Sequence, residues 1–314
     1  MQRLWLAYIC AVANAAIIGF SFLFTKQALE SASPMDTLAF RFIASFAVMT
    51  IPVAFGWIKL DYKGKPLGKL LLLALFYPAS FFALQAFGLV HASSAEGGIL
   101  YAFTPVLTTL LASAVLKERT NGKQKLALLL SAFGVVFIFA MKGSGIELKS
   151  MTGIALLFMS CLTFAGYGVL ARSLTKQFRP TELSYATLGF GFVTFLAFSV
   201  WGHVSNGTLS GYFSPLADGK FLIAILFLGV ISSLITSLLS NYVLSKLEAS
   251  KMSVFSNLST VVSIAAGALF LGEEITVYHL IGSVLIIAGV IGMNRFGRSK
   301  QGAPKPAVSA GKTA

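Results

Sequence analysis

Long apolar stretches recur along the whole chain and constrain its fold more than any other feature. Ten of them have the length, ~20 residues, that an α-helix needs to cross the hydrocarbon core of a bilayer. They lie at 5–25, 36–58, 68–90, 93–116, 124–141, 152–171, 183–202, 220–244, 251–271 and 276–294. The connections between them are short and contain turn-forming residues. We therefore expect an all-α polytopic membrane protein with ten transmembrane helices.

The composition excludes several other classes of protein. Hydrophobic residues make up 56% of the chain and charged residues 11%, whereas soluble domains contain roughly 45–50% and about 25%. The sequence has no P-loop, no His-Glu-x-x-His and no Gly-x-Ser-x-Gly. Its two cysteines, Cys10 and Cys161, lie inside apolar stretches and have no metal-ligand spacing. We expect no enzymatic activity, no cofactor and no metal site.

The net charge of +13 is explained by the distribution of Lys and Arg between loops. With the N-terminus in the cytoplasm, 19 of the 24 basic residues fall in inside segments and 4 in outside segments. Such a bias predicts that both termini are cytoplasmic in a multi-pass protein of the inner or plasma membrane. Residues 297–314 are expected to form a disordered basic cytoplasmic tail. The charge therefore indicates the lipid bilayer, and not nucleic acid, as its partner.

An internal repeat divides the chain into two similar halves. The segment 116–118 (Leu-Lys-Glu) recurs as 271–273 (Leu-Gly-Glu), and each is followed by a helix that ends in Gly-Val, at an offset of 155 residues. Pro34 and Asp36 match Pro180 and Glu182 at an offset of 146. Five helices per copy is an odd number, so the second copy crosses the membrane in the opposite sense. We expect two inverted five-helix repeats, at 1–142 and 143–296, an arrangement typical of secondary transporters.

These features together resemble the EamA family of the drug/metabolite transporter superfamily. The marks are the two repeats, Arg41 in the second span, Pro105 in the fourth, and Glu118 and Glu273 at the ends of the fourth and ninth. The resemblance covers residues 5–296 and implies inverted repeats around a central cavity and export of amino acids, metabolites or drugs. Two departures leave the substrate open: Thr260 stands where the first half has Pro105, and the first span lacks the family's Trp-Gly.

Two ionisable residues inside spans are candidates for gating or an ion pair. Arg41 lies in the outer part of the second span and Glu96 in the outer part of the fourth, at a similar expected depth. Charges in the membrane are costly, so each is a functional hypothesis by default. The pair could form a gate or a proton-linked switch, or it could only fix the positions of two helices. The glutamates Glu118 and Glu273 are expected to be helix-terminal or loop-clamping residues.

Bulky polar side chains in several spans are candidates for lining a solute cavity. Most of them offer hydrogen-bond donors and acceptors without a fixed charge, which suits an uncharged, zwitterionic or amphipathic solute. Aromatic residues such as Phe81, Phe82, Phe103 and Tyr167 could stack on an apolar solute. Only Arg41 is basic and deep in a span, so nucleotide sugars and sugar phosphates are poor candidates. The candidate cavity residues are Asn14, Gln85, Glu96, Tyr101, Thr104, Tyr167, Ser237, Asn241 and Asn257.

The sequence therefore favours a secondary transporter that exports small metabolites, amino acids or drugs by alternating access. Its expected partners are a small-molecule solute and the bilayer, with a homodimer as a further possibility. A lipid or lipid-linked sugar flippase of the same fold is the alternative. An intramembrane enzyme would need a cluster of catalytic carboxylates or histidines at one depth, and a channel or scaffold would show no saturable flux.

Overall fold

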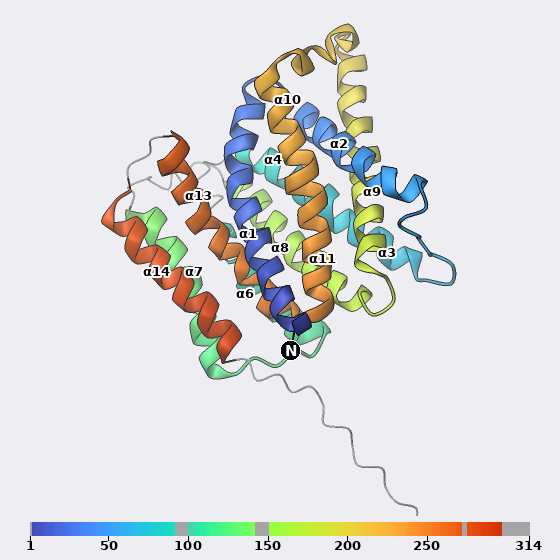
Figure 1. Cartoon of the computed structure of the whole chain (residues 1–314). Coiled ribbons are helices and arrows are strands. Elements are labelled where there is room, and N and C mark those ends of the chain that lie inside the picture. The colour runs from blue at the N-terminus through green and yellow to red at the C-terminus, as the bar shows by residue number, and fades with distance from the viewer. Residues whose placement is uncertain (1, 92–99, 102, 142–150, 272–274, 297–314) are drawn as a thin grey trace, which may run out of the picture.

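The computed structural model describes residues 2–91, 100–101, 103–141, 151–271 and 275–296, and their regular structure is helical throughout (Figure 1). The chain folds into a bundle of long helices joined by short connections. In order, these are α1 (Gln2–Leu29), α2 (Pro34–Ala54), α3 (Leu67–Ala74), η1 (Leu75–Ser80), α4 (Phe81–His91), α6 (Thr104–Val115), α7 (Gly122–Met141), α8 (Met151–Leu174), α9 (Pro180–Ser205), η2 (Leu209–Gly211), η3 (Ser214–Ala217), α10 (Gly219–Leu226), η4 (Phe227–Ile235), α11 (Thr236–Lys246), α12 (Ala249–Ser253), α13 (Phe255–Leu271) and α14 (Val277–Arg295).

Several of these helices have the length and hydropathy of membrane spans. Seven described segments qualify: Leu4–Ser21, Pro34–Ala54, Leu67–Gln85, Met151–Leu174, Pro180–Ser205, Gly219–Lys246 and Val277–Arg295. The apolar helix α6 is shorter, and part of the stretch expected at 93–116 lies outside the described residues. A multi-pass membrane protein follows from these segments. The total of ten spans stays a prediction.

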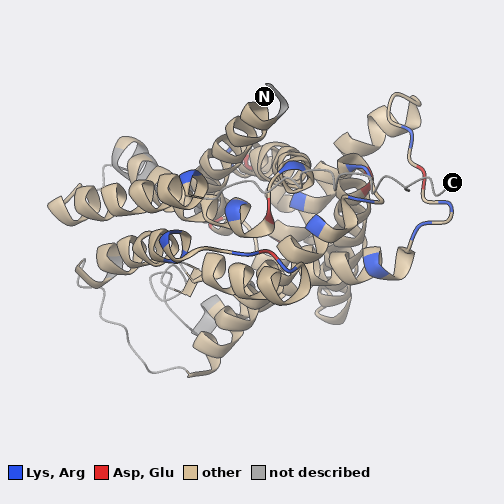
Figure 2. Ribbon diagram, turned by 90° about the horizontal axis from the view of Figure 1, so that it is seen from below, with Lys and Arg blue, Asp and Glu red and all other residues tan. Residues whose placement is uncertain are grey.

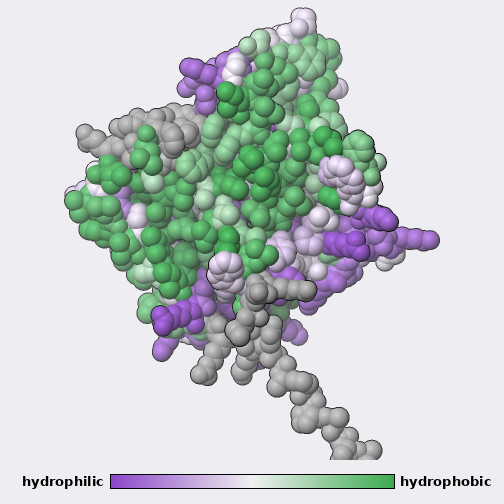
Figure 3. Space-filling view, viewed as in Figure 1, coloured by the Kyte–Doolittle hydropathy of each residue, from purple (hydrophilic) through white to green (hydrophobic). Residues whose placement is uncertain are grey.

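The surface agrees with a membrane setting. The space-filling view shows a broad apolar region across the middle of the molecule, with hydrophilic residues towards its two ends (Figure 3). Trp5, Phe198 and Val284 are among the large apolar side chains that are exposed to the surroundings of the protein. In Figure 1, α1 begins and α14 ends at the same, lower end. The view from below that end shows more Lys and Arg than Asp and Glu (Figure 2).

Local sequence signals explain where two of the long helices begin. The Ser33 hydroxyl caps α2 by accepting from the backbone N–H of Asp36 (3.2 Å), and Pro34 occupies the first turn. In α9, Pro180 takes the equivalent place, and the Glu182 carboxylate accepts from the Arg179 N–H (2.9 Å). A proline in the first turn causes no loss of a helical hydrogen bond, because N–H groups there have no partner within the helix. A carboxylate in the first turn interacts favourably with the positive end of the helix dipole.

The two halves pack against each other along most of their helices. Helix α7 lies against α14, α1 against α13, α2 against α9 and α4 against α8, and each of these pairs joins one half to the other. The contacts are reciprocal. Gly134 abuts the backbone of Gly282, and Gly289 abuts Ala127. The repeat offset of 155 relates Gly134 to Gly289 and Ala127 to Gly282, so each contact is the repeat counterpart of the other. Two copies related by a twofold axis account for both contacts.

A second reciprocal contact joins α2 to α9. The rings of Phe46 and Phe192 stack with their centroids 5.3 Å apart. They are separated by 146 residues, which is the offset that relates the two halves in this part of the chain. A residue that contacts its own repeat counterpart lies on or near the axis between the copies. The interface between the halves therefore passes through α2 and α9.

Two of the expected spans, at 68–90 and 220–244, contain segments that are not regular α-helix. The first consists of α3, η1 and α4, and Tyr77 in η1 has an extended backbone (φ −145°, ψ 121°). Pro78 explains the break, since it has no N–H and disfavours helix at the preceding residue. The second contains a π-helical segment, η4. Such π segments are frequent at functional sites. The break at Tyr77 and the π-helical segment η4 lie in corresponding places of the two halves. The stretch at 251–271 is likewise divided, into α12 and α13.

Candidate functional site

An aromatic cluster fills the interface between the halves beside the break at Tyr77. The Tyr77 ring lies 4.7 Å from the ring of Tyr167 and 5.7 Å from that of Phe164, centroid to centroid. Phe81 lies 5.0 Å from Phe164. Because the rings come from η1 and α4 of the first half and from α8 of the second, a relative movement of the halves would rearrange them. We define this aromatic cluster as Tyr77, Phe81, Phe82, Tyr101, Phe164 and Tyr167.

A chain of hydrogen bonds leads from the cluster into the second half. The Tyr167 hydroxyl donates to Asn241 Oδ1 (3.2 Å), and Asn241 Nδ2 donates to Ser184 Oγ (2.9 Å). These three buried side chains tie α8, α11 and α9 together. Tyr167 and Asn241 are two of the residues expected from the sequence. Ser184, a small residue on α9, was not.

A second chain of hydrogen bonds crosses between the two halves at the cluster. Gln85 Nε2 donates to the Tyr101 hydroxyl (3.2 Å), and that hydroxyl lies 3.4 Å from Ser160 Oγ. Ser160 donates in turn to the backbone carbonyl of Phe81 (2.9 Å). The structure therefore brings two further expected residues, Gln85 and Tyr101, to the same place. Their phenol, amide and hydroxyl groups line one side of the aromatic cluster without adding a net charge.

Arg41 lies against the cluster at Phe82 and is buried. Its guanidinium carbon lies 4.8 Å from the centroid of the Phe82 ring. Nε donates to Ser233 Oγ (2.6 Å), and Nη2 donates to the carbonyl (3.4 Å) and the hydroxyl (3.3 Å) of Ser232. This residue of α2 is thereby bound to η4 of the other half. Glu96, expected as its ion-pair partner, lies outside the described residues, so that pairing stays a prediction.

The remaining expected residues lie apart from the aromatic cluster or have no polar contact. Asn14 Oδ1 accepts from Ser240 Oγ (3.2 Å), and Asn257 Nδ2 donates to Ser131 Oγ (3.1 Å). Each of these bonds joins a helix of one half to a helix of the other. The hydroxyls of Thr104 and Ser237 are buried and have no hydrogen-bond partner among the described residues. Phe103, expected near the cavity, is instead 41% exposed.

Glu118 holds the halves together at the end where α1 begins. Its carboxylate accepts from the backbone N–H groups of Ala249 (2.9 Å) and Ser250 (3.2 Å) and from the Ser250 hydroxyl (2.6 Å). This is the clamping role expected from the sequence. Its repeat counterpart Glu273 lies outside the described residues.

Two further carboxylates clamp opposite ends of the α2–α9 pair. Glu182, at the start of α9, forms an ion pair with Lys65 (2.6 Å) and accepts from the Asp61 N–H (3.2 Å), beyond the end of α2. Nearby, burial and the charge of Glu182 raise the pKa of the Tyr62 phenol above its ordinary value. The three residues at 61, 62 and 65 thus form one polar contact with the second half.

At the other end, Asp36 at the start of α2 contacts the last turns of α9. It accepts from the Ser199 hydroxyl (2.5 Å) and lies 3.2 Å from His203 Nε2. His203 Nδ1 also lies 2.8 Å from the Thr208 hydroxyl, and His279, in the first turn of α14, is buried. Histidines at helix ends hydrogen-bond the local backbone or a neighbouring carboxylate when the fold brings one near.

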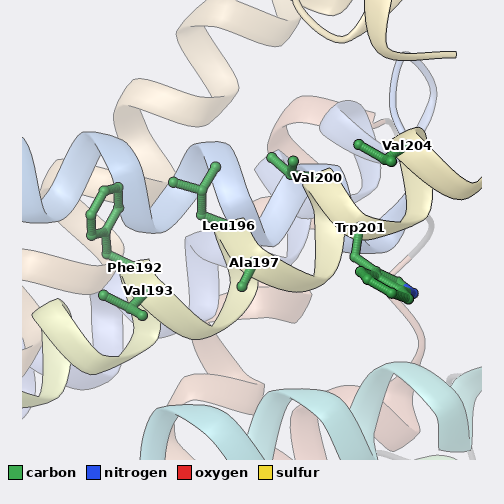
Figure 4. A pocket seen from close by; sticks show the side chains of 7 residues that line it. All are labelled: Phe192, Val193, Leu196, Ala197, Val200, Trp201 and Val204. Atoms are coloured by element: carbon green, nitrogen blue, oxygen red, sulfur yellow. The ribbon is translucent and has the colours of Figure 1, made fainter.

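Two hollows on the surface contain none of the expected cavity residues in their lining. One is lined by seven apolar residues that all lie on α9 (Figure 4), among them the exposed Val193 and Trp201. In a membrane protein a face of this kind meets lipid chains. Among the residues that the structure describes, no three His, Cys, Asp or Glu side chains are grouped closely enough to hold a metal ion.

Sequence comparison agrees with the repeated architecture. The profile of the EamA-like transporter family matches residues 5–140 and again residues 151–295. The chain belongs to the EamA-like transporter family. The two matches divide the chain where the internal repeat does, and they include the residues of both halves that build the aromatic cluster.

Several similar proteins have names that describe them as transporters. An "Uncharacterized transporter YcxC" of Bacillus subtilis (strain 168) is 48% identical over 92% of this chain and 92% of its own length. A "Probable amino-acid metabolite efflux pump" of Escherichia coli (strain K12) is 23% identical over 60% of this chain and 63% of its own. A solved structure described as "Crystal structure of protein" has a TM-score of 0.76 at 17% identity, covering 94% of this chain and 99% of that one. The last similarity concerns the fold alone.

Proposed function

We propose that this EamA-family protein is a secondary transporter that exports small metabolites, amino acids or drugs. It has ten spans, arranged as two inverted five-helix repeats at 1–142 and 143–296, followed by a basic tail at 297–314. Both termini lie in the cytoplasm, and the membrane is the inner or plasma membrane. The bias of Lys and Arg supports this orientation, and the reciprocal contacts between the halves support the inverted repeats.

The aromatic cluster is the observation that carries this proposal. It combines stacked rings with the phenol and amide groups of Tyr101, Tyr167 and Asn241, and it is built from both halves. Ligand sites in proteins combine apolar and aromatic walls with a few placed polar groups. In transporters with inverted repeats, the solute site lies between the copies near the middle of the membrane. The cluster has such a composition and is built from both copies, which supports a solute site there.

The positions of the contacts that clamp the two halves support alternating access. At one end, Glu118 and Glu182 hold the halves together, and at the other end Asp36 does the same. Opening towards one side requires one set of these contacts to break while the other set is kept. Each set consists of a few charged hydrogen bonds near the water interface, where water can replace the lost partners. Rocking of one repeat against the other would thereby expose the cluster alternately.

Saturable flux through the purified full-length protein tests this function. Proteoliposomes would be loaded with mixtures of amino acids and other small metabolites, and counterflow of labelled solutes would be measured. We expect saturable flux of at least one solute and its loss when Tyr167 is replaced by Phe together with Asn241 by Leu. Linear, unsaturable flux would indicate a channel and contradict the proposal. Neither the family match nor the names of the relatives favour a lipid flippase.

A further inference from the structure

Arg41 is a buried cation whose described partners are all uncharged. It is 7% exposed, and its partners are the two serines of η4 and the face of Phe82. The described ion pairs lie elsewhere, at the helix ends. Among the described residues, Nη1 has no hydrogen-bond acceptor at all. Nη1 of Arg41 therefore takes no part in the described hydrogen bonds between α2 and η4.

A hydrogen-bonded contact between α2 and η4 does not require a charged donor. The hydroxyls of Ser232 and Ser233 would accept equally from a neutral donor such as Gln or Ser. Among the described residues Arg41 has no counter-charge, and burying a cation in this way is costly both in proteins and in membranes. The positive charge therefore has a use other than joining α2 to the second half.

Two buried hydroxyls beside Arg41 are also without partners. Thr37 precedes Arg41 by one helical turn on α2, and Ser237 follows Ser233 by one turn on the facing segment. Each is 3% exposed, and neither Thr37 Oγ1 nor Ser237 Oγ has a hydrogen-bond partner among the described residues. Groups of this kind are normally satisfied in folded proteins. A buried cation flanked by two unused hydroxyls is a set of donors suited to an anionic oxygen.

The charge is specific to one half of the molecule. At the offset of 146, the counterpart of Arg41 is Thr187, whose hydroxyl donates to the carbonyl of Leu183 on its own helix (3.0 Å). The counterpart of Thr37 is Leu183 itself, which is buried and apolar. If the architecture common to both repeats required a cation at this depth, the second half would need one as well.

We propose that Arg41 binds the carboxylate of the transported solute and that the solute is a small carboxylate with an apolar or aromatic body. This proposal rests on the proposed transport function. Guanidinium binds carboxylate through paired hydrogen bonds, for which Nη1 is available. Phe82 joins the two parts of the site, because it lies under the guanidinium and belongs to the aromatic cluster, where the apolar body would pack. Amino acids with apolar or aromatic side chains fit this description.

Matched pairs of acids and amides test the proposal. Full-length protein in proteoliposomes would be assayed for counterflow of L-leucine, L-methionine, L-phenylalanine and L-tyrosine, each beside its α-carboxamide. We expect the wild type to favour the acids by about tenfold or more, the discrimination equivalent to ~1.4 kcal/mol. Arg41→Gln should abolish this preference. Thr187→Val, at the corresponding place in the second half, should retain it.

The hydroxyls provide a second readout that holds even if Arg41→Gln fails to fold. Thr37→Val and Ser237→Ala each remove a buried hydroxyl that has no partner, so the melting temperature should rise or stay the same. The concentration of amino acid that gives half-maximal flux should nevertheless increase several-fold. An unchanged half-maximal concentration in both variants would show that these hydroxyls do not contact the solute.

The possible results separate this proposal from the transport function. If the wild type moves acids and amides equally well, or if Arg41→Gln keeps the preference for acids, the carboxylate site is wrong while transport stands. The second result is expected of an arginine that serves only as a partner of Glu96. If none of the eight compounds shows saturable flux, the carboxylate proposal fails. Transport of other metabolites in the broader panel would then show whether the function fails with it.

Discussion

At the scale of single residues, Asn241 is the polar side chain on which the second half of the site depends. Replacement by Leu, of similar size, would leave the Tyr167 hydroxyl and Ser184 Oγ without a partner in a buried place. An unsatisfied buried group costs about 1–3 kcal/mol. We expect a lower melting temperature, measured in detergent, together with strongly reduced solute flux. Asn294→Ala is the matched control, since its amide donates only to Val290 O of its own helix (2.9 Å). Equal effects of both replacements would contradict a special role for Asn241.

Glu118 allows a residue-scale test of the clamp between the halves. Its two carboxylate oxygens accept three hydrogen bonds from Ala249 and Ser250. Glu118→Gln keeps the size but replaces one acceptor oxygen by a donor, so at least one bond is lost and the others weaken. We expect destabilisation of about 1–3 kcal/mol in a denaturant titration. Glu30→Gln, at an exposed carboxylate just beyond the end of α1, should have an effect of less than about 1 kcal/mol. The reverse order of the two effects would rule out the clamp.

At the scale of elements, the close approach of α7 and α14 depends on glycine. A methyl group at Gly282 would lie too close to the Ile138 side chain and 2.8 Å from the Gly134 carbonyl. Overpacking of this kind costs about 1–3 kcal/mol. We expect Gly282→Ala to lower the melting temperature by several degrees. Gly202→Ala on α9 is the control, because nothing lies within 4 Å of the added methyl group. If Gly282→Ala is as stable as the control, the two helices can separate without loss.

The elements also show which parts of the structure the sequence could predict. Hydropathy is a local property, so the positions of the long apolar helices were predictable from the residues themselves. The break at Tyr77 was not, because prolines such as Pro78 are tolerated inside membrane helices and do not always interrupt them. Tyr77 was therefore missed as a member of the aromatic cluster, although its place directly before a proline was the available signal.

The sequence predicted which polar side chains are buried better than it predicted which of them are in contact. Tyr101 and Phe103 are two residues apart and equally aromatic, yet the first bonds to Gln85 while the second is 41% exposed. Such differences depend on the packing of neighbouring helices and not on the local sequence. For the same reason the sequence indicated Asn241 as a cavity residue but not its partner Ser184. Pairings across the halves require the three-dimensional structure.

At the scale of the whole molecule, the orientation in the membrane is open to direct test. Lys63 and Ser210 follow α2 and α9, whose contacts through Asp36 and Glu182 place the two loops at opposite ends of the molecule. The distribution of basic residues predicts that Lys63 lies on the cytoplasmic side. Single cysteines at these two positions would be introduced after Cys10 and Cys161 are replaced by Ala. We expect an impermeant maleimide to label Ser210→Cys in intact bacterial cells, and Lys63→Cys only after permeabilisation. The opposite pattern would show that the protein has the inverse orientation in the membrane. Labelling of both cysteines in intact cells would contradict the membrane crossings by α2 and α9.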